Sequence, residues 1–274
     1  MLLESNFFQD NIASVKEISV SGTATTAALD LMLSHLTLDS SVPYAIATNV
    51  ATSSFKAASD TSGNKALSVI MKSAASNSDL VFKDCFITSL TLSGDAGTEG
   101  GRVKFSATFQ SGTKVASGEL TATDVAVDTA ITANDYFMSG WDADDRIIAG
   151  VANGVISSFS LTVDNPLTFS GIASTGYEQA IRSGEISATA SFSVLYDDNF
   201  LDMFERFNTT QAAGATTGAT LMNHQASLAN EYFGFKFPKS IITEVSFNEG
   251  SSMMLDVSVK AIGSGSADLF EIAC

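Results

Sequence analysis

Residues 155–207 contain two runs of strict two-residue alternation, and this pattern constrains the fold more than any other feature. Between residues 158 and 163, Phe, Leu and Val alternate with Ser and Thr, and between residues 186 and 194, Ile, Ala, Phe and Val do the same. Side chains two residues apart point to the same face of an extended chain, so each run predicts a half-buried β-strand. Asp164-Asn165-Pro166 ends the first run with turn residues, and a polar loop follows through Gly184.

A short amphipathic helix is predicted after the second run. Asp197 and Asp198 can cap its N-terminus, and apolar residues then recur at helical spacing. We expect this apolar face to pack against the strands through Phe200, Leu201, Phe204 and Phe207. The predicted unit is therefore a strand, a long loop, an antiparallel strand and a helix.

Further strands and one further helix are predicted outside this unit. A helix is predicted over residues 27–36, where Ala28, Leu31, Met32 and Leu36 follow helical spacing. Short apolar or alternating runs separated by Gly, Asp and Asn predict strands. These runs are residues 15–21, 65–71, 80–92, 103–109, 231–237, 240–247 and 253–262.

An internal repeat is visible in this pattern. Residues 82–93 followed by 99–109 parallel residues 237–248 followed by 249–259, with Ile-Thr at the centre of the first strand and Glu-Gly before the second. We also expect the early strand at 15–21 to correspond to 158–165. Chance similarity among β-strands is the alternative, because few residues are identical. The repeat predicts two tandem related domains, residues 1–132 and 133–274.

Composition favours a globular, strand-rich protein that does not hold nucleic acid. Hydrophobic residues make up 45% of the 274 residues and charged residues only 16%, with a formal net charge of −16. Tight binding to phosphates needs clustered Lys and Arg, so the acidic excess indicates either general solubility or a surface that stays near an anion without adhering. Cys85 and Cys274 are too few for a disulfide framework, and Cys85 is expected to be a buried thiol.

Recognisable catalytic and targeting patterns are scarce. The two histidines, His35 and His224, are isolated in sequence, and the acids Asp142, Asp144 and Asp145 do not follow the EF-hand spacing. The N-terminus lacks a basic region before an apolar core, and no apolar run approaches a membrane-spanning length. We therefore predict no catalysis, no cofactor, no metal site and no membrane insertion, with use in the cytosol or assembly there.

With these strands in view, the chain resembles the tail tube proteins of long-tailed bacteriophages of the siphovirus type. The resemblance rests on FSLTVDNPLTFSGI, GEISATASFSVLYDDNFLDMFERF and FGFKFPKSIITEVSFNEGSSMMLDVSVKA, and in the first half on FKDCFITSLTLSGDAGTEGGRVKFSATFQSG. It implies a mainly β fold, a β-sandwich or near-barrel with a short flanking helix and a long loop. The region 10–55 departs from the second half, because it shows no long hairpin followed by a helix.

The resemblance also implies how such a chain works. Family members form rings with six tube domains, stacked into a hollow virion tail, and three chains with two domains each give a pseudo-sixfold ring; a hexamer of chains is the other possibility. The implied partners are other copies of the chain, tail tip and terminator proteins, and, transiently in the lumen, the tape measure protein and viral DNA passing during ejection. Assembly in the host cytoplasm is expected.

Acidic side chains are the candidate functional residues. Inward carboxylates would repel phosphate and keep DNA from adhering to the wall. The candidates for the lumen or the loop are Asp95, Glu99, Asp164, Glu178 and Glu185. We expect the loop 168–184, rich in small and polar residues, to be mobile in the free subunit and ordered between stacked rings.

Two other classes of function stay open at this point. A β-sandwich adhesion or carbohydrate-binding module would expose a cluster of aromatic residues, whereas this chain has one Trp. An enzyme with an unrecognised carboxylate pair is the second alternative, because the carboxylates are too numerous to single out two. Tubes or rings in negative-stain microscopy would favour the tail tube interpretation, and monodisperse monomers would favour the others.

Overall fold

The computed structural model describes residues 14–36, 45–46, 49–50, 54–57, 66–71, 79–98, 101–117, 146–152, 155–173, 176–196, 203–205, 207–208, 218–225, 232–249, 253–262 and 269–273. The helix is α1 (Thr26–Leu36). The strands before residue 133 are β1 (Lys16–Thr23), β2 (Ala45–Ile46), β3 (Asn49–Val50), β4 (Ser54–Ala57), β5 (Leu67–Met71), β6 (Leu80–Asp95), β7 (Lys104–Ser111) and β8 (Ala116–Ser117). The later strands are β9 (Arg146–Ile148), β10 (Val151–Ala152), β11 (Ile156–Asp164), β12 (Leu167–Ala173), β13 (Gly176–Arg182), β14 (Ser187–Leu195), β15 (Gly218–Gln225), β16 (Tyr232–Glu249), β17 (Met253–Ala261) and β18 (Phe270–Ala273).

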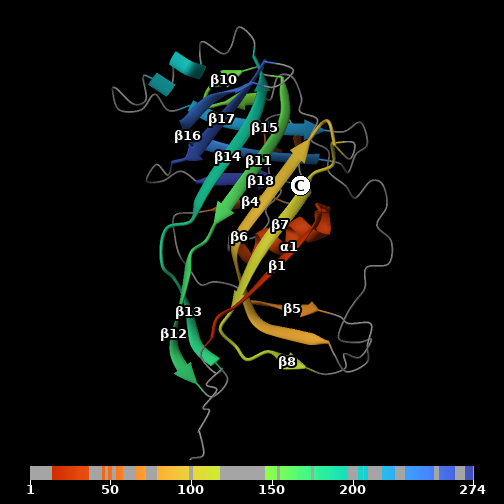
Figure 1. Ribbon diagram of the computed structural model, residues 1–274, viewed down its shortest axis with the longest axis vertical. Helices are drawn as coiled ribbons and strands as arrows, with labels where there is room; N and C mark the ends of the chain where they lie inside the picture. Colours follow the sequence, from red (N-terminus) through yellow and green to blue (C-terminus); the bar gives the residue numbers. More distant parts are fainter. Residues whose placement is uncertain are drawn as a thin grey trace, which may run out of the picture.

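The fold is mainly β and antiparallel, as the alternation predicted, and the described strands form no closed barrel. One large sheet carries the order β1-β7-β6-β11-β14-β17-β16-β15-β9-β10, with β4, β5, β8 and β18 paired off this path. Its central strands run side by side along the long axis of the molecule (Figure 1). Strands of both halves belong to this sheet, because β11 pairs with β6.

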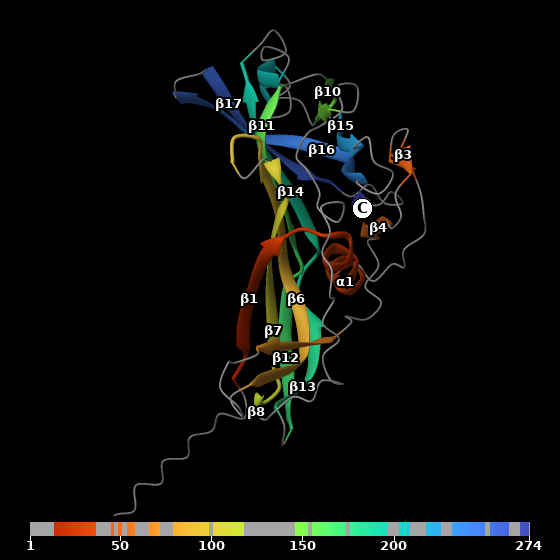
Figure 2. The ribbon, with the colours of Figure 1, turned by 90° about the vertical axis from the view of Figure 1, so that its right-hand side faces the viewer.

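The core lies on one face of this sheet. Alternate residues of the central strands are buried, for example Leu92, Leu161 and Ala190, which are cross-strand neighbours. α1 lies on one side of the central strands (Figure 2). It buries Leu29, Met32, Leu33 and Leu36 in the same core, in agreement with the helix predicted over 27–36. The opposite face of the sheet keeps its polar side chains.

The two halves pair their strands in the same order and register. β6 and β7 shift register between Ile87 and Ser89, and β16 and β17 shift between Ile242 and Glu244. β5 and β15 also pair with β6 and β16 through matching shifts. At the position of the main shift, Thr88 Oγ1 donates to the Thr108 carbonyl at 3.2 Å, and Thr243 donates in the same way to Ser258 at 3.1 Å. The register agrees with the repeat read from the sequence.

One part of the predicted correspondence was wrong. β1 pairs with β7 as β14 pairs with β17, since Ile18 faces Phe109 and Ala190 faces Val259 at equivalent points. The strand at 15–21 therefore corresponds to β14, and not to 158–165. Each of these strands is followed by helical residues, α1 after β1 and residues 203–205 and 207–208 after β14.

The segment 168–184, predicted as a mobile loop, is a β-hairpin. β12 and β13 pair in antiparallel fashion from Leu167↔Arg182 to Ala173↔Gly176 and project as an arm beyond the ends of β11 and β14 (Figure 1). We call β12 and β13 together the arm. Its small and polar composition hid this strand structure, because local alternation there is weak.

Candidate functional site: the polar sheet face and its open edge

The polar face of the main sheet is a continuous band of hydroxyl side chains, which we call the hydroxyl face. Directly opposed residues in a β-ladder share a face, so the register defines rows that run across the strands. The Ser and Thr residues of these rows are Ser19, Ser21, Thr23, Ser89, Thr91, Ser93, Ser106, Thr108, Ser158, Ser160, Thr162, Ser187, Thr189, Ser191, Ser193, Ser246 and Ser258. The band crosses from the first half into the second without a break.

Side-chain hydrogen bonds link neighbouring strands within the hydroxyl face. Ser89 Oγ donates to Asp164 Oδ1 at 2.7 Å, and the Thr91 and Thr162 hydroxyls lie 3.1 Å apart. Both contacts cross the β6–β11 boundary, where the two halves meet. These bonds tie the two halves together on the hydroxyl face.

Acidic side chains outnumber lysines on the hydroxyl face. Its charged residues, placed by the same register, are Glu17, Asp95, Asp164, Glu244 and Asp256 with Lys104 and Lys260. Of the acids predicted for the lumen or the loop, Asp95 and Asp164 therefore lie on this face. Glu185 is exposed in the connection between β13 and β14, and Glu99 lies outside the described residues.

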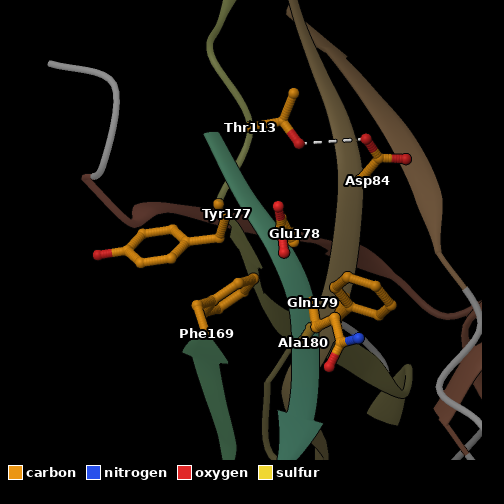
Figure 3. A pocket seen from close by; sticks show the side chains of 9 residues that line it. Asp84, Thr113, Phe169, Tyr177, Glu178, Gln179 and Ala180 are labelled. Atoms are coloured by element: carbon orange, nitrogen blue, oxygen red, sulfur yellow. Dashed lines mark hydrogen bonds between the residues drawn. The ribbon is translucent and has the colours of Figure 1, made fainter. Parts of the chain in front are cut away.

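Glu178 belongs to the arm and lines a cavity of about 320 Å³ between the arm and the first half of the chain. Phe86 of β6 and Phe169 and Tyr177 of the arm supply aromatic walls, with ring centroids 6.3 Å apart for Phe86–Phe169 and 5.9 Å apart for Phe169–Tyr177. Asp84 lines the other side and accepts a hydrogen bond from the Thr113 hydroxyl at 3.1 Å (Figure 3). This cavity separates the arm from the end of β6.

Two glycines fix the arm to the first half of the chain. Tyr177 N donates to the Gly112 carbonyl at 3.0 Å, and Thr113 forms a β-bridge with Gly176. A Cβ on Gly176 would overlap the Gly112 carbonyl oxygen, and its φ of 140° also favours glycine. The arm is thus held at its tip, where Ile172, the cross-strand neighbour of Tyr177, is 70% exposed.

The helical residues after β14 differ from the predicted packing face. Met203 is 1% exposed and Phe207 packs against the core, but Phe204 is 41% exposed. The prediction for Phe204 was wrong in the single chain, because the buried side of this short segment begins at Met203. Phe200 and Leu201 lie outside the described residues.

The second half of β16 has one open edge among the described residues. Ser240 pairs with Gly218 of β15 and with Ala261 of β17, which places these two strands on opposite edges of β16. Beyond Ser240, only the β17 edge has a partner in the described chain. The equivalent edge of β6 is covered by β11 from Ser89 to Asp95. Within the described part of the chain, β16 therefore presents a row of backbone groups without a strand partner where β6 is paired.

Burial at equivalent positions shows the consequence of that open edge. Leu92 of β6 is 1% exposed, whereas its counterpart Phe247 of β16 is 55% exposed. The Phe247 ring stacks at a tilt on Tyr196, with centroids 6.0 Å apart. Phe247 was not among the residues predicted from the sequence, although the repeat aligns it with Leu92 in an apolar strand. Exposed apolar residues on an unpaired edge are typical of a surface that associates with another chain.

The remaining chemistry of the described residues is sparse. Cys85 is a buried thiol, as predicted; burial raises its pKa, and its Sγ lies 3.3 Å from the Phe82 carbonyl. No group of three or more His, Cys, Asp or Glu side chains gathers in the described part of the chain. Among the helical residues described, none form a helix long and apolar enough to cross a membrane.

Comparison with known proteins adds one finding. The model of the phage tail tube protein family matches residues 11–261 of this chain. No curated protein matches it.

Proposed function

The chain belongs to the phage tail tube protein family and is a structural protein of the virion tail, and we propose that its copies join through their sheet edges into rings that stack as a hollow tube. The observation that carries this proposal is the boundary between the two halves. There β11 pairs with β6 on one side and β14 on the other. The equivalent edge of β16 has no strand partner among the described residues beyond Ser240, so another copy can continue the sheet there.

We propose that residues 1–132 and 133–274 act as two related tube domains. The matching register shifts at Ile87/Ser89 and Ile242/Glu244 support this division. A ring of three chains would then contain six such domains, as the family resemblance implies. Association of this kind is head-to-tail, and a rotation that closes gives a ring of finite size.

We propose that the hydroxyl face lines the lumen. The opposite face is occupied by the core and α1, so the hydroxyl face is the broad sheet surface that the described residues leave available to line a bore. Its small hydroxyl side chains and its excess of carboxylates over lysines give a passing DNA duplex few cations to pair with. This proposal includes passage of DNA through the lumen during ejection and transient contact of the lumen with the tape measure protein. It also includes contacts of the tube ends with tail tip and terminator proteins.

Assembly is tested by substituting two apolar residues that are equally exposed in the single chain. Phe247 and Leu31 are each 55% exposed, the first on the open edge of β16 and the second on α1. Phe247→Asp should abolish rings and tubes in negative-stain microscopy and leave a folded subunit, because it places a charge on the joining edge. Leu31→Asp is the matched control and should assemble normally. Tubes formed by Phe247→Asp at the normal protein concentration would contradict edge-to-edge association.

The lumen assignment is tested by adding one cation per chain. Ser160 lies on the hydroxyl face, whereas Ser183 is exposed in the connection after the arm. Ser160→Lys should preserve assembly and slow DNA ejection, with the strongest effect at low ionic strength, since every ring adds cations that face the phosphates. Ser183→Lys, which changes the charge equally, should eject DNA at the normal rate. Equal rates for both variants would place the hydroxyl face outside the bore.

A further inference from the structure

The proposed ring leaves the ends of the strands as its surfaces along the tube axis. Copies join through the sheet edges, the core occupies one face of the sheet, and the hydroxyl face lines the bore. The remaining direction runs along β11 and β14, which are antiparallel neighbours of nine residues each. Copies in successive rings therefore meet where these two strands begin and end.

The arm lies at one of these ends and carries exposed apolar side chains. It follows β11 and precedes β14, at the end where β11 stops and β14 starts (Figure 1). Ile172 is 70% exposed and Ile181 is 50% exposed. Ile172 pairs with Tyr177, and Tyr177 and Ile181 are an even number of residues apart in β13, so the register places both Ile side chains on one face of the arm. The arm thus presents an apolar face to solvent in the single chain.

The opposite end of β11 and β14 carries a second apolar surface, which we call the rim: Val155, Leu195 and Tyr196. Each of these side chains is at least 39% exposed. The Leu195 N–H donates to the Val155 carbonyl at 2.8 Å, so these two residues are cross-strand neighbours. Leu195 follows Ser193 on the hydroxyl face, which means that apolar side chains replace hydroxyl side chains at this end of the proposed bore. Clustered exposed apolar residues are typical of an interaction surface.

We propose that the rim of each copy binds the arm of a copy in the next ring. This inference rests on the proposed ring and gives its stacking a defined contact, in which Ile172 and Ile181 pack on the rim. The two surfaces differ, and each copy carries both, at opposite ends of β11 and β14. A head-to-tail contact along the strand direction adds copies without closing. It therefore extends the tube ring by ring and gives every ring the same direction.

Charge at the two ends favours this contact over a contact between two arms. Glu178 is exposed on the arm, so two arms that faced each other would oppose like charges at short range. β7 runs parallel to β11, because both are antiparallel to β6, and its start therefore lies at the rim end of the sheet. Arg102 and Lys104 are exposed there. The arm carboxylate is thus attracted towards the rim end of the next copy and repelled by a second arm.

Cross-linking in the assembled full-length protein tests the proposal. Ile172→Cys is combined with Val155→Cys, Leu195→Cys or Tyr196→Cys in three separate variants, and a short bismaleimide linker joins the thiols so that disulfide geometry is not required. Within one chain, the nine residues of β14 place the arm and the rim roughly 30 Å apart. A short linker must therefore join two copies.

The length of the cross-linked product identifies the contact. Each copy has one arm and one rim, so links between rings continue along the tube and give a ladder on a denaturing gel that exceeds the number of chains in one ring. Links within a ring would stop at that number. All variants carry Cys85→Ala and Cys274→Ser to remove the native thiols. Ile172→Cys combined with Leu31→Cys, which lies on α1, is the matched control and should give no ladder.

A substitution at the rim gives a second measurement. Leu195→Asp should keep the β-sheet circular dichroism and the rings of the parent protein but form no tubes, because it places a charge in the apolar contact. Leu31→Asp, which makes the same change on α1, should form tubes of normal length.

The outcomes separate this inference from the proposed ring. A ladder that exceeds one ring, in preparations that contain tubes, supports both. Tubes without such a ladder from any of the three pairs, or tubes of normal length formed by Leu195→Asp, overturn the inference and leave the ring standing. Monomers of the parent protein under all conditions overturn both.

Discussion

Alanine substitutions at two equivalent positions should have opposite consequences for folding and assembly. Leu92 and Phe247 occupy the same place in the two halves, but Leu92 is 1% exposed and Phe247 is 55% exposed. Leu92→Ala should cost the folded subunit about 2–5 kcal/mol, since it leaves a cavity under β11. Phe247→Ala should cost the isolated subunit roughly 1–2 kcal/mol, because solvent already reaches half of the ring.

The larger effect of Phe247→Ala should appear in assembly. A Phe side chain has about 150–250 Å² to bury, and roughly 100 Å² of it remains for a partner at this exposure. At about 25 cal/mol per Å², this area contributes about 2.5 kcal/mol to each joint. Its loss weakens each joint about 50- to 100-fold.

Two measurements check these values. Denaturant unfolding at low protein concentration compares the stability of the free subunits, and sedimentation across a concentration series gives the lowest concentration at which tubes form. Phe247→Ala should raise that concentration strongly, although its subunit is the more stable of the two variants. The reasoning is refuted if Phe247→Ala forms tubes at the normal concentration, or if it destabilises the free subunit as much as Leu92→Ala.

Two further predictions concern the helical residues after β14 and the arm. Met203→Ala should destabilise the free subunit by about 2–5 kcal/mol because Met203 is buried, and Phe204→Ala by less than about 1.5 kcal/mol; equal losses in thermal unfolding would contradict the observed packing. Gly176→Ala should release the arm from the Gly112 carbonyl at a cost of about 1–3 kcal/mol. It should speed proteolysis within the arm, whereas Gly97→Ala in an exposed turn should not; an unchanged cleavage rate would show that the arm needs no close glycine contact.

The strands and the repeat could be predicted because their signals are local. Alternation around residues 158–163 and 186–194 identified β11 and β14, and the aligned repeat implied the common register of β6–β7 and β16–β17. Period-two patterns result directly from burying one face of a sheet. The same reasoning placed α1, because helical spacing extends over three turns.

The features that the sequence did not predict depend on contacts between segments that are far apart in the sequence. Gly176 of the arm contacts Gly112, a residue more than sixty positions earlier in the sequence. The local pattern of residues 168–184 therefore did not predict a strand. The helical segment contains several Phe residues, and only docking decides that Met203 faces the core while Phe204 does not. Glu178 could not be separated from Asp164 by charge alone. Asp164 follows the alternating run 158–163 in the position of a polar residue, which places its side chain on the polar face. This pattern was visible in the sequence.

An open edge has to accept one partner and reject others. Two β16 edges could meet each other as a symmetric dimer, which would end assembly at two copies. An antiparallel pairing centred on Glu244, which is exposed on β16, would oppose two carboxylates, and like charges across strands are destabilising. The net charge of −16 on each copy further penalises loosely fitting contacts. The contact that remains favourable covers Phe247 with apolar residues and pairs the backbone of β16. Because the edge of β1 differs from that of β16, such a contact joins unlike surfaces. It can therefore propagate around a ring.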